Sequence, residues 1–196
     1  MAQTTPRSAR PRDAAATKRA ILDSALVAFS RSGFDGTGTR EIAGNAGVDP
    51  RLITRYFGSK EGLFTEVVAE LFRTPLIGAS GTNRTAARDS LTAESGDPDP
   101  MLLILRSAAN PQAAEIMRER LETSSQRQLA ERLPGDDATA RAALLLSMCT
   151  GVRMFRNIIG DTAFTHADVD RLATYLERAL DAVAAGDSEQ DRTSPR

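Results

Sequence analysis

The stretch of sequence that decides the fold is residues 39–64, which read TREIAGNAGVDPRLITRYFGSKEGLF. It predicts a short helix that starts at Thr39, because a threonine at the N-cap accepts a hydrogen bond from an amide of the first turn. Gly47 ends this helix, since glycine tolerates the positive φ of a sharp turn. Asp49 and Pro50 then predict a second short helix, as its N-cap and first helical residue. Two short helices joined by a turn are what a helix-turn-helix requires.

The chain on either side continues the helical pattern. Apolar residues recur over 21–29 with the spacing of one helix face, and Ser59 is predicted to cap a helix over about 60–73. No strand pattern separates these elements. Residues 17–73 are therefore predicted to form an all-α domain, after a disordered basic tail over residues 1–16.

The second helix of the motif has an apolar and a polar face. Ile53 and Phe57 fall on the interior side, whereas Arg51, Thr54 and Arg55 fall on the exposed side. An ordinary solvated helix would show the same charges, so this pattern alone does not establish DNA as the partner. Arginine does match both phosphates and guanine edges.

Several residues at fixed spacing make the match more specific. The alanine of the first motif helix, the glycine of the turn, the Tyr56-Phe57 pair and the following GSKEGL run occur together within residues 17–72. The chain thus resembles the tetracycline-repressor (TetR) family of transcriptional regulators. The resemblance implies an all-α protein, with an N-terminal helix-turn-helix three-helix DNA-binding domain and a C-terminal helical domain for ligand binding and dimerisation. It implies a homodimer that binds a palindromic double-stranded DNA operator as a ligand-responsive repressor, with no cofactor.

The family pattern also implies which residues bind DNA. Amides and Arg40 at the start of the first motif helix can hold a phosphate, and either arginine of the second helix can reach guanine O6 and N7. Thr54 stands where the family very often has tyrosine, which implies a different contact there. The implied DNA-binding residues are Thr39, Arg40, Pro50, Arg51, Leu52, Thr54, Arg55, Tyr56 and Lys60.

Helical periodicity resumes after a Ser-, Gly- and Asp-rich connector. A short helix is predicted over 84–92, and four more over 100–109, 111–132, 137–159 and 166–185, with Thr165 capping the last. Family resemblance implies that residues 80–185 form the ligand-binding and dimerisation domain, before a disordered tail over 186–196.

Helix 137–159 is apolar around much of its circumference. One apolar row runs through Leu145, Val152 and Ile159, and a second, about 100° away, runs through Leu144 and Ile158. One row can face the helix's own domain and the other a second subunit, and the sequence leaves open which does so. The predicted dimerisation residues are Leu145, Val152, Ile159, Leu172, Leu176, Ala179 and Val183.

The C-terminal half is also expected to bind a small hydrophobic effector. Methionine adapts to ligands of varied shape, and Arg106 is a candidate polar anchor. Each of these side chains can equally be an ordinary core residue. The predicted ligand-binding residues are Met101, Leu105, Arg106, Met117, Leu121, Met148 and Phe155.

Composition and charge are compatible with this interpretation. Residues 1–73 carry 11 Lys and Arg against 8 Asp and Glu, whereas residues 74–196 carry 14 against 18, so the basic excess lies in the predicted DNA-binding part. The longest apolar run, residues 142–152, is short and bounded by arginines, so no membrane span is predicted. The single Cys149 cannot form an internal disulfide, which fits a reducing cytoplasm.

Two other functions compete with that of a ligand-responsive regulator. An enzyme is not expected, because His166 is the only histidine and the sequence holds no Gly-rich phosphate loop, HExxH or CxxC. No metal site is expected either. A DNA-binding regulator without a small-molecule effector remains an alternative, which a ligand that raises the melting temperature and frees DNA would exclude.

Overall fold

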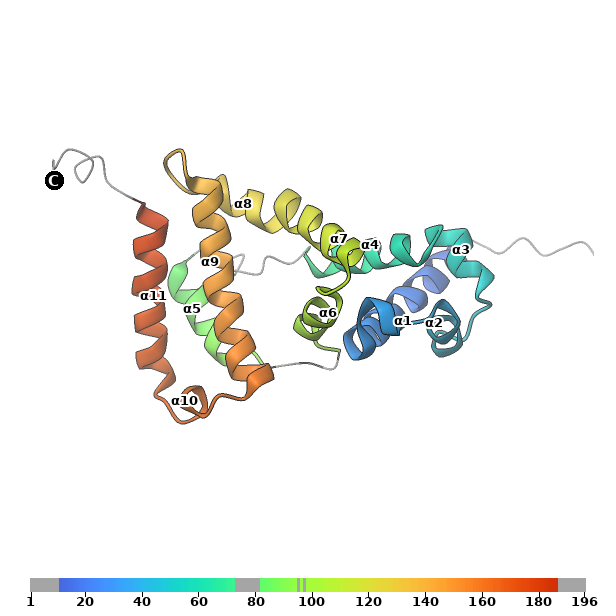
Figure 1. The fold of residues 1–196 in the computed structure, drawn as a ribbon, viewed down its shortest axis with the longest axis horizontal. Helices are drawn as coiled ribbons and strands as arrows, with labels where there is room; N and C mark the ends of the chain where they lie inside the picture. The colour runs from blue at the N-terminus through green and yellow to red at the C-terminus, as the bar shows by residue number, and fades with distance from the viewer. Residues whose placement is uncertain (1–10, 73–81, 95, 97, 187–196) are drawn as a thin grey trace, which may run out of the picture. The chain divides into compact units, whose positions relative to one another are not determined.

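A computed structural model describes residues 11–72, 82–94, 96 and 98–186, and all regular structure in these ranges is helical (Figure 1). The all-α class predicted from the sequence is confirmed. The chain divides into two compact units. Unit 1 comprises Met1–Val68 and Asp97–Ala114, and unit 2 comprises Ala69–Gly96 and Glu115–Arg196.

Unit 1 is built around aromatic side chains of α1 and α4. Its helices are α1 (Pro11–Gly36), α2 (Thr39–Asn45), α3 (Arg51–Phe57), α6 (Pro100–Ser107) and most of α4 (Lys60–Leu71). The rings of Phe29 and Phe34 each meet Phe64 edge-on, with centroids 5.0 Å apart. Such edge-to-face pairs stabilise a core beyond the area that they bury.

The first helix begins earlier than predicted. Residues 11–16 were expected to belong to a disordered tail, but α1 starts at Pro11. Proline is favoured at the first helical position, and the alanines at 14–16 are strong helix formers. Residues 1–10 of the predicted tail lie outside the described part of the chain.

Gly33 interrupts α1 and makes room for α6. Its φ of 69° and ψ of −177° lie in a region open essentially to glycine alone. A Cβ atom at this position would lie 2.5 Å from the backbone oxygen of Arg106. Beyond the break, the Phe34 amide donates a hydrogen bond of 3.1 Å to the Ser107 hydroxyl. The two helices can therefore approach closely only because residue 33 has no side chain.

This contact joins part of the predicted C-terminal domain to unit 1. Residues 80–185 were expected to form one domain, whereas α6 packs on α1 and belongs to unit 1. The Arg106 guanidinium donates to the carbonyls of Ser30 and Arg31, and the Asn110 amide donates to the Asp35 carboxylate at 2.7 Å. The carbonyls at the end of an α-helix lack partners within the helix, so they are natural acceptors for such side chains.

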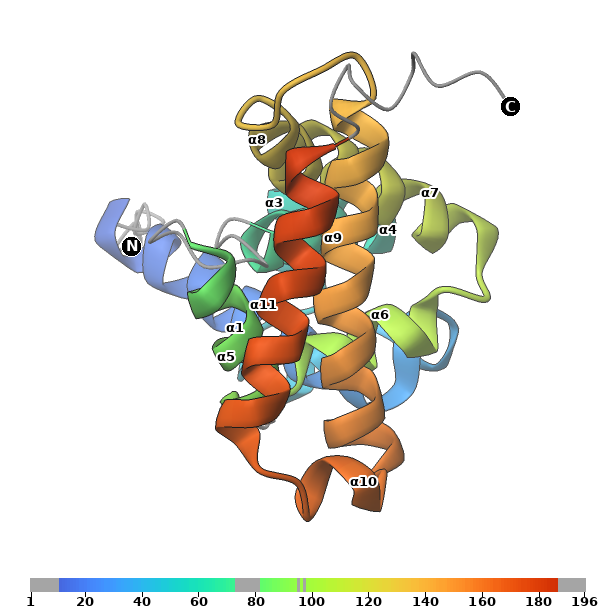
Figure 2. The same ribbon diagram turned by 90° about the vertical axis from the view of Figure 1, so that its left-hand side faces the viewer.

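Unit 2 contains most of the remaining helices. They are α5 (Asn83–Thr92), the greater part of α7 (Pro111–Leu121), the π-helical η1 (Glu122–Gln126), α8 (Arg127–Ala130), α9 (Ala138–Arg153), the π-helical η2 (Met154–Ile159), α10 (Thr162–Thr165) and α11 (Val169–Ala185). Helices α9 and α11 lie side by side, connected at one end through α10 (Figure 2). Ala86 and Ala87 of α5 complete the core with Leu145, Cys149 and Leu180.

The predicted helices of this half are present, with three local differences. The expected helix over 111–132 contains the π-helical turn η1, and the one over 137–159 ends in η2. The expected helix over 166–185 is shorter, because the Asp168 carboxylate, and not Thr165, accepts from the first amides of α11. Of the predicted tail over 186–196, only Gly186 is described.

Helix α9 exposes part of its apolar surface. Together α9 and η2 form a 22-residue segment, Ala138–Ile159, that is long and apolar enough to cross a membrane by length and composition. The sequence prediction of no membrane span considered only the uncharged run at residues 142–152 within this segment. One side of the helix packs in unit 2, where Leu145 is 2% exposed, while Leu144 is 50% exposed.

Candidate nucleic-acid interface

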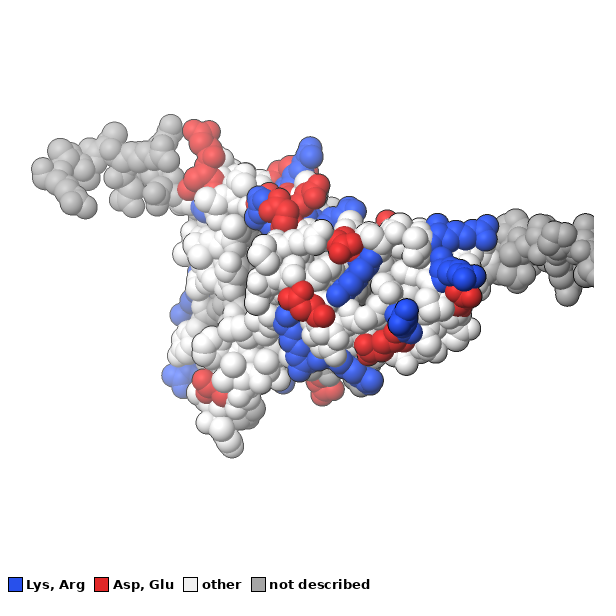
Figure 3. Space-filling view, turned by 45° about the vertical axis from the view of Figure 1, so that its right-hand side comes forward, with Lys and Arg blue, Asp and Glu red and all other residues white. Residues whose placement is uncertain are grey.

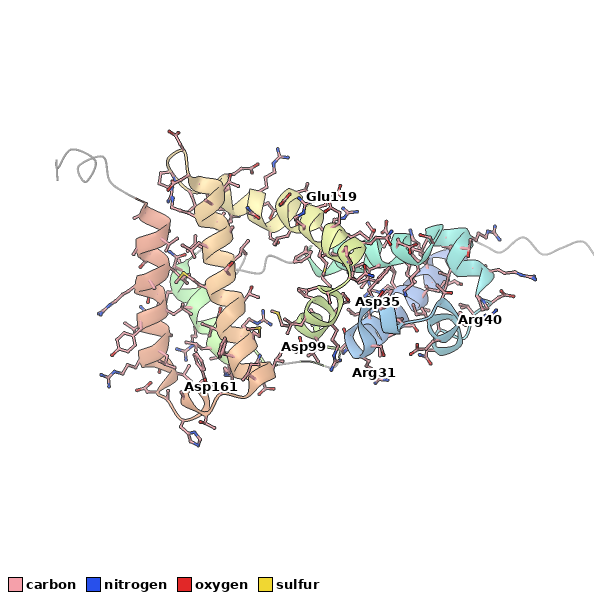
Figure 4. The ribbon with its side chains drawn as sticks, viewed as in Figure 1. Arg31, Asp35, Arg40, Asp99, Glu119 and Asp161 are labelled. Carbon is pink, nitrogen blue, oxygen red and sulfur yellow. The ribbon has the colours of Figure 1, made fainter. Side chains whose placement is uncertain are left out.

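Helix α2, the first helix of the motif, packs against α1. Gly38, and not the predicted Thr39, occupies the N-cap position, and no side chain caps the helix. Ile42 and Ala43 are buried, and the Ser24 hydroxyl of α1 donates to the Ile42 carbonyl at 2.9 Å. Arg40 is exposed on the same helix (Figure 4).

The turn follows the sequence prediction, whereas α3 starts one residue later than predicted, at Arg51. Gly47 has a φ of 67°, the positive value that the turn was expected to need. Pro50, and not the predicted Asp49, occupies the N-cap position, and the Asp49 carboxylate accepts a 2.8 Å hydrogen bond from the Arg51 amide beside it. Gly58 ends α3 with a φ of 78°.

Helix α3 presents one polar face to solvent. Ile53 and Phe57 are buried, whereas Arg51, Thr54 and Arg55 are exposed. Three further residues implied to bind DNA lie beside this face: Pro50 is exposed, and Leu52 and Tyr56 are half-buried. Lys and Arg side chains lie at the α3 end of unit 1, with acidic side chains beside them, in the space-filling view (Figure 3). A helix held rigidly by its buried face and basic on the other can enter the major groove of DNA.

Both lysines of the chain lie over aromatic rings of unit 1. The Nζ atom of Lys60 lies 4.5 Å from the centroid of Phe34, and that of Lys18 lies 5.3 Å from the centroid of Phe57. Such contacts hold a cation in place while its charge remains available to a phosphate. Sequence reasoning assigned Lys60 to DNA but gave Lys18 no role, because no spacing rule links residue 18 to residue 57.

The start of α4 is organised as predicted. The Ser59 hydroxyl accepts from the Gly62 amide at 3.2 Å. Its hydrogen bond to Glu61 holds the pKa of that carboxyl below the usual value. Glu61 is thus a carboxylate in the first turn of a helix, where negative charge is favourable.

The structure divides the predicted ligand-binding residues between the units. Met101, Leu105 and Arg106 belong to unit 1, whereas Met117, Leu121, Met148 and Phe155 belong to unit 2. Arg106 already donates to two carbonyls of α1, which explains its position without a ligand. Met148 packs against the core of unit 2, and Phe155 is 46% exposed.

The predicted dimerisation residues are also divided by their surroundings. Leu145 lies in the core of unit 2, with Leu176 and Val183 packed against it. Ile159, in the same predicted row, is 63% exposed. A straight helix drifts relative to a 3.5-residue repeat, and the π-helical η2 turns the row further. Val152, Leu172 and Ala179 are half-buried.

Groups suited to catalysis do not gather in the described part of the chain. No cluster of three or more His, Cys, Asp and Glu able to hold a metal ion occurs there. Cys149 is buried, and burial raises the pKa of its thiol. Such a thiol is unreactive, since the thiolate is the nucleophile.

Comparisons with known proteins agree with this geometry. Residues 21–67 match a family described as bacterial regulatory proteins of the tetR family, and residues 81–183 match the tetracyclin repressor-like C-terminal domain. The probable HTH-type transcriptional regulator YttP of Bacillus subtilis is 41% identical over 76 residues, which span 39% of this chain and 35% of YttP. The match therefore covers about a third of that relative's length.

Two solved structures have the same fold over most of the chain. A TetR-family regulator of Streptomyces coelicolor is 26% identical, with a TM-score of 0.57 over 90% of this chain and 98% of that one. FadR of Bacillus subtilis, solved in complex with stearoyl-CoA, is 16% identical, with a TM-score of 0.61 over 87% of this chain and 99% of that one. The two family matches agree with the basic outer face of α3 and with the turn at Gly47 that precedes it. The chain therefore belongs to the TetR family of bacterial transcriptional regulators.

Proposed function

We propose that the chain is a homodimeric repressor that binds a palindromic operator in the cytoplasm and releases it when a small ligand binds unit 2. The observation that carries this proposal is the outer face of α3, where Arg51, Thr54 and Arg55 are exposed above the buried Ile53 and Phe57. The flanking Thr39, Arg40, Tyr56 and Lys60 complete the proposed DNA surface.

The DNA-binding part is tested by selecting bound fragments from the source genome and measuring their affinity by fluorescence anisotropy. Arg51→Ala and Arg55→Ala are expected to weaken operator binding and to relax base preference, since arginine forks read guanine. Arg127→Ala is the matched control, because Arg127 is exposed on α8 and pairs with Glu131 at 3.2 Å. Equal losses in all three variants would contradict the assignment of α3.

The dimer is proposed from the exposed apolar surface of α9 and η2. One recognition helix reads few base pairs, whereas two related by a two-fold axis read half-sites about one helical turn apart. Leu144, Phe155 and Ile159 are large and apolar, and they are 50%, 46% and 63% exposed in the single chain. A second copy covering them removes apolar surface from water.

Leu144→Glu tests this interface better than a change at Leu145, which lies in the core. The variant is expected to keep its helical circular dichroism, to be monomeric by light scattering and to lose tight operator binding. A wild-type protein that is monomeric both free and on its operator would refute the dimer.

The ligand is proposed to bind the helices of unit 2. The FadR complex, which has this fold, holds stearoyl-CoA. A compound library screened by thermal shift and by operator release tests this part. If no compound does both, a regulator without a small-molecule effector is the correct description.

A further inference from the structure

A π-helical turn interrupts the long helix of unit 2 that begins as α7. The turn, η1, spans Glu122–Gln126, with helical φ and ψ on both sides. Turns of this kind often lie at functional sites, because the wider turn displaces side chains from their α-helical positions. The displaced segment here carries three consecutive hydroxyl residues, Thr123, Ser124 and Ser125.

The three hydroxyls differ in their partners. Thr123 donates to the Glu119 carbonyl at 2.7 Å, and Ser124 donates to the Arg120 carbonyl. These bonds to the preceding turn are usual for hydroxyl residues in helices. The hydroxyl of Ser125, which is 6% exposed, has no hydrogen-bond partner.

An unpartnered buried hydroxyl is unfavourable for the folded chain. It loses its hydrogen bonds to water and gains none in return, so alanine would fit the same place at lower cost. The fold therefore offers no reason for a hydroxyl at residue 125. A molecule from outside the chain would supply one.

The surroundings of Ser125 indicate what kind of molecule this is. Met117 and Leu121 lie eight and four residues before it, on the same side of the helix, and Met117 is buried. Helix α9 packs against η1. The molecule would therefore meet mostly apolar and flexible side chains.

Charge is the remaining criterion. Arg141 is the buried charged residue in the described part of unit 2. It donates to the Asp137 carboxylate at 2.8 Å and to the carbonyls of Val183, Ala184 and Pro134. Its donors are therefore engaged. A charged ligand group buried beside Ser125 would therefore find no free, fully buried counter-ion, and burying a charge without one is costly.

We propose that Ser125 anchors the effector, and that the effector is a neutral, largely apolar molecule with one hydroxyl or carbonyl group. This inference rests on the proposed ligand-responsive function and names the chemical class of the ligand. The Ser125 hydroxyl can donate to a carbonyl or accept from a hydroxyl.

The test uses matched probes that differ in one group. They are the straight-chain 1-alkanols and 2-alkanones of 6 to 14 carbons, with benzyl alcohol and cyclohexanol, against carboxylates of the same skeletons at pH 7.5. Melting temperature and operator release are measured for the full-length protein. Neutral probes are expected to raise the melting temperature and release DNA, and carboxylates are not.

Three alanine variants locate the contact. Ser125→Ala is expected to melt no lower than wild type without ligand, to bind operator normally and to bind the neutral probes about 3–10-fold more weakly, the loss of one hydrogen bond. Ser124→Ala removes a hydroxyl that already has a partner. Ser30→Ala removes the other unpartnered buried hydroxyl in the described residues, which lies in unit 1. Both controls are expected to keep wild-type affinity for the probes.

The outcomes separate this inference from the proposed function. Unchanged probe affinity in Ser125→Ala would overturn the anchor, and binding of carboxylates alone would overturn the ligand class; either result leaves a ligand-responsive repressor in place. If neither these probes nor a broad library moves the melting temperature or the operator affinity, both proposals are refuted.

Discussion

Gly33→Ala is predicted to destabilise unit 1 strongly. The φ of 69° and ψ of −177° lie in a region whose cost for a side-chain-bearing residue is about 1–3 kcal/mol. The added Cβ would also lie 2.5 Å from the Arg106 backbone oxygen, which must move, and overpacking of this kind costs about 1–3 kcal/mol. The two effects together predict a loss of about 2–6 kcal/mol in the free energy of unfolding.

Urea unfolding followed by circular dichroism at 222 nm measures this loss. Gly44→Ala is the matched control, because a Cβ at residue 44 of α2 meets nothing within 4 Å. Alanine is the better helix former by about 1 kcal/mol, so the control is expected to be slightly more stable than wild type. Ser107→Ala leaves the buried Phe34 amide without its acceptor and is expected to cost about 1–3 kcal/mol.

The difference in unfolding free energy between Gly33→Ala and Gly44→Ala tests whether α6 requires a glycine at residue 33. If Gly33→Ala is as stable as Gly44→Ala, then α6 does not need the close approach at residue 33. If Gly33→Ala is destabilised and Ser107→Ala is not, then the close backbone approach at residue 33 stabilises unit 1, and the hydrogen bond between Phe34 and Ser107 does not.

Three further predictions follow from single contacts. Lys60→Ala is expected to reduce the salt dependence of DNA binding by about one phosphate contact, for operator and random DNA alike. It is also expected to lower the free energy of unfolding by about 0.5–1 kcal/mol, because the contact with the Phe34 ring is lost. An unchanged salt slope would show that Lys60 does not contact DNA. Arg141→Met is expected to lower the melting temperature, because the carbonyls of Val183, Ala184 and Pro134 lose their donor; an unchanged melting temperature would show that water replaces the guanidinium. Burial raises the pKa of the Cys149 thiol, so the stability that the neutral thiol contributes is complete below the unfolded pKa and is lost as pH rises through the alkaline range. Wild type is therefore expected to lose stability above about pH 9 faster than Cys149→Ala. Parallel curves of unfolding free energy against pH for the two proteins would contradict this prediction.

The sequence alone determined the helix-turn-helix and its polar face. Its signals are local: Gly47 permits the turn, Asp49 accepts from an amide two residues away at the start of α3, and the spacing of Ile53 and Phe57 defines the buried side. Contacts between residues close in sequence depend little on the rest of the chain, so spacing predicts them. The membership of the family rests on the same short-range pattern.

Only the tertiary structure decided which partners the C-terminal helices take. Helix α6 belongs to unit 1 because Arg106 and Ser107 meet backbone groups exposed by the break at Gly33, more than 70 residues earlier. The first apolar row of α9 passes from the core at Leu145 to solvent at Ile159 because η2 changes its register. The isolation of the Ser125 hydroxyl likewise follows from the turn η1 and from packing around it. Burial depends on residues that meet only after folding, and helical periodicity carries no information about which elements supply them.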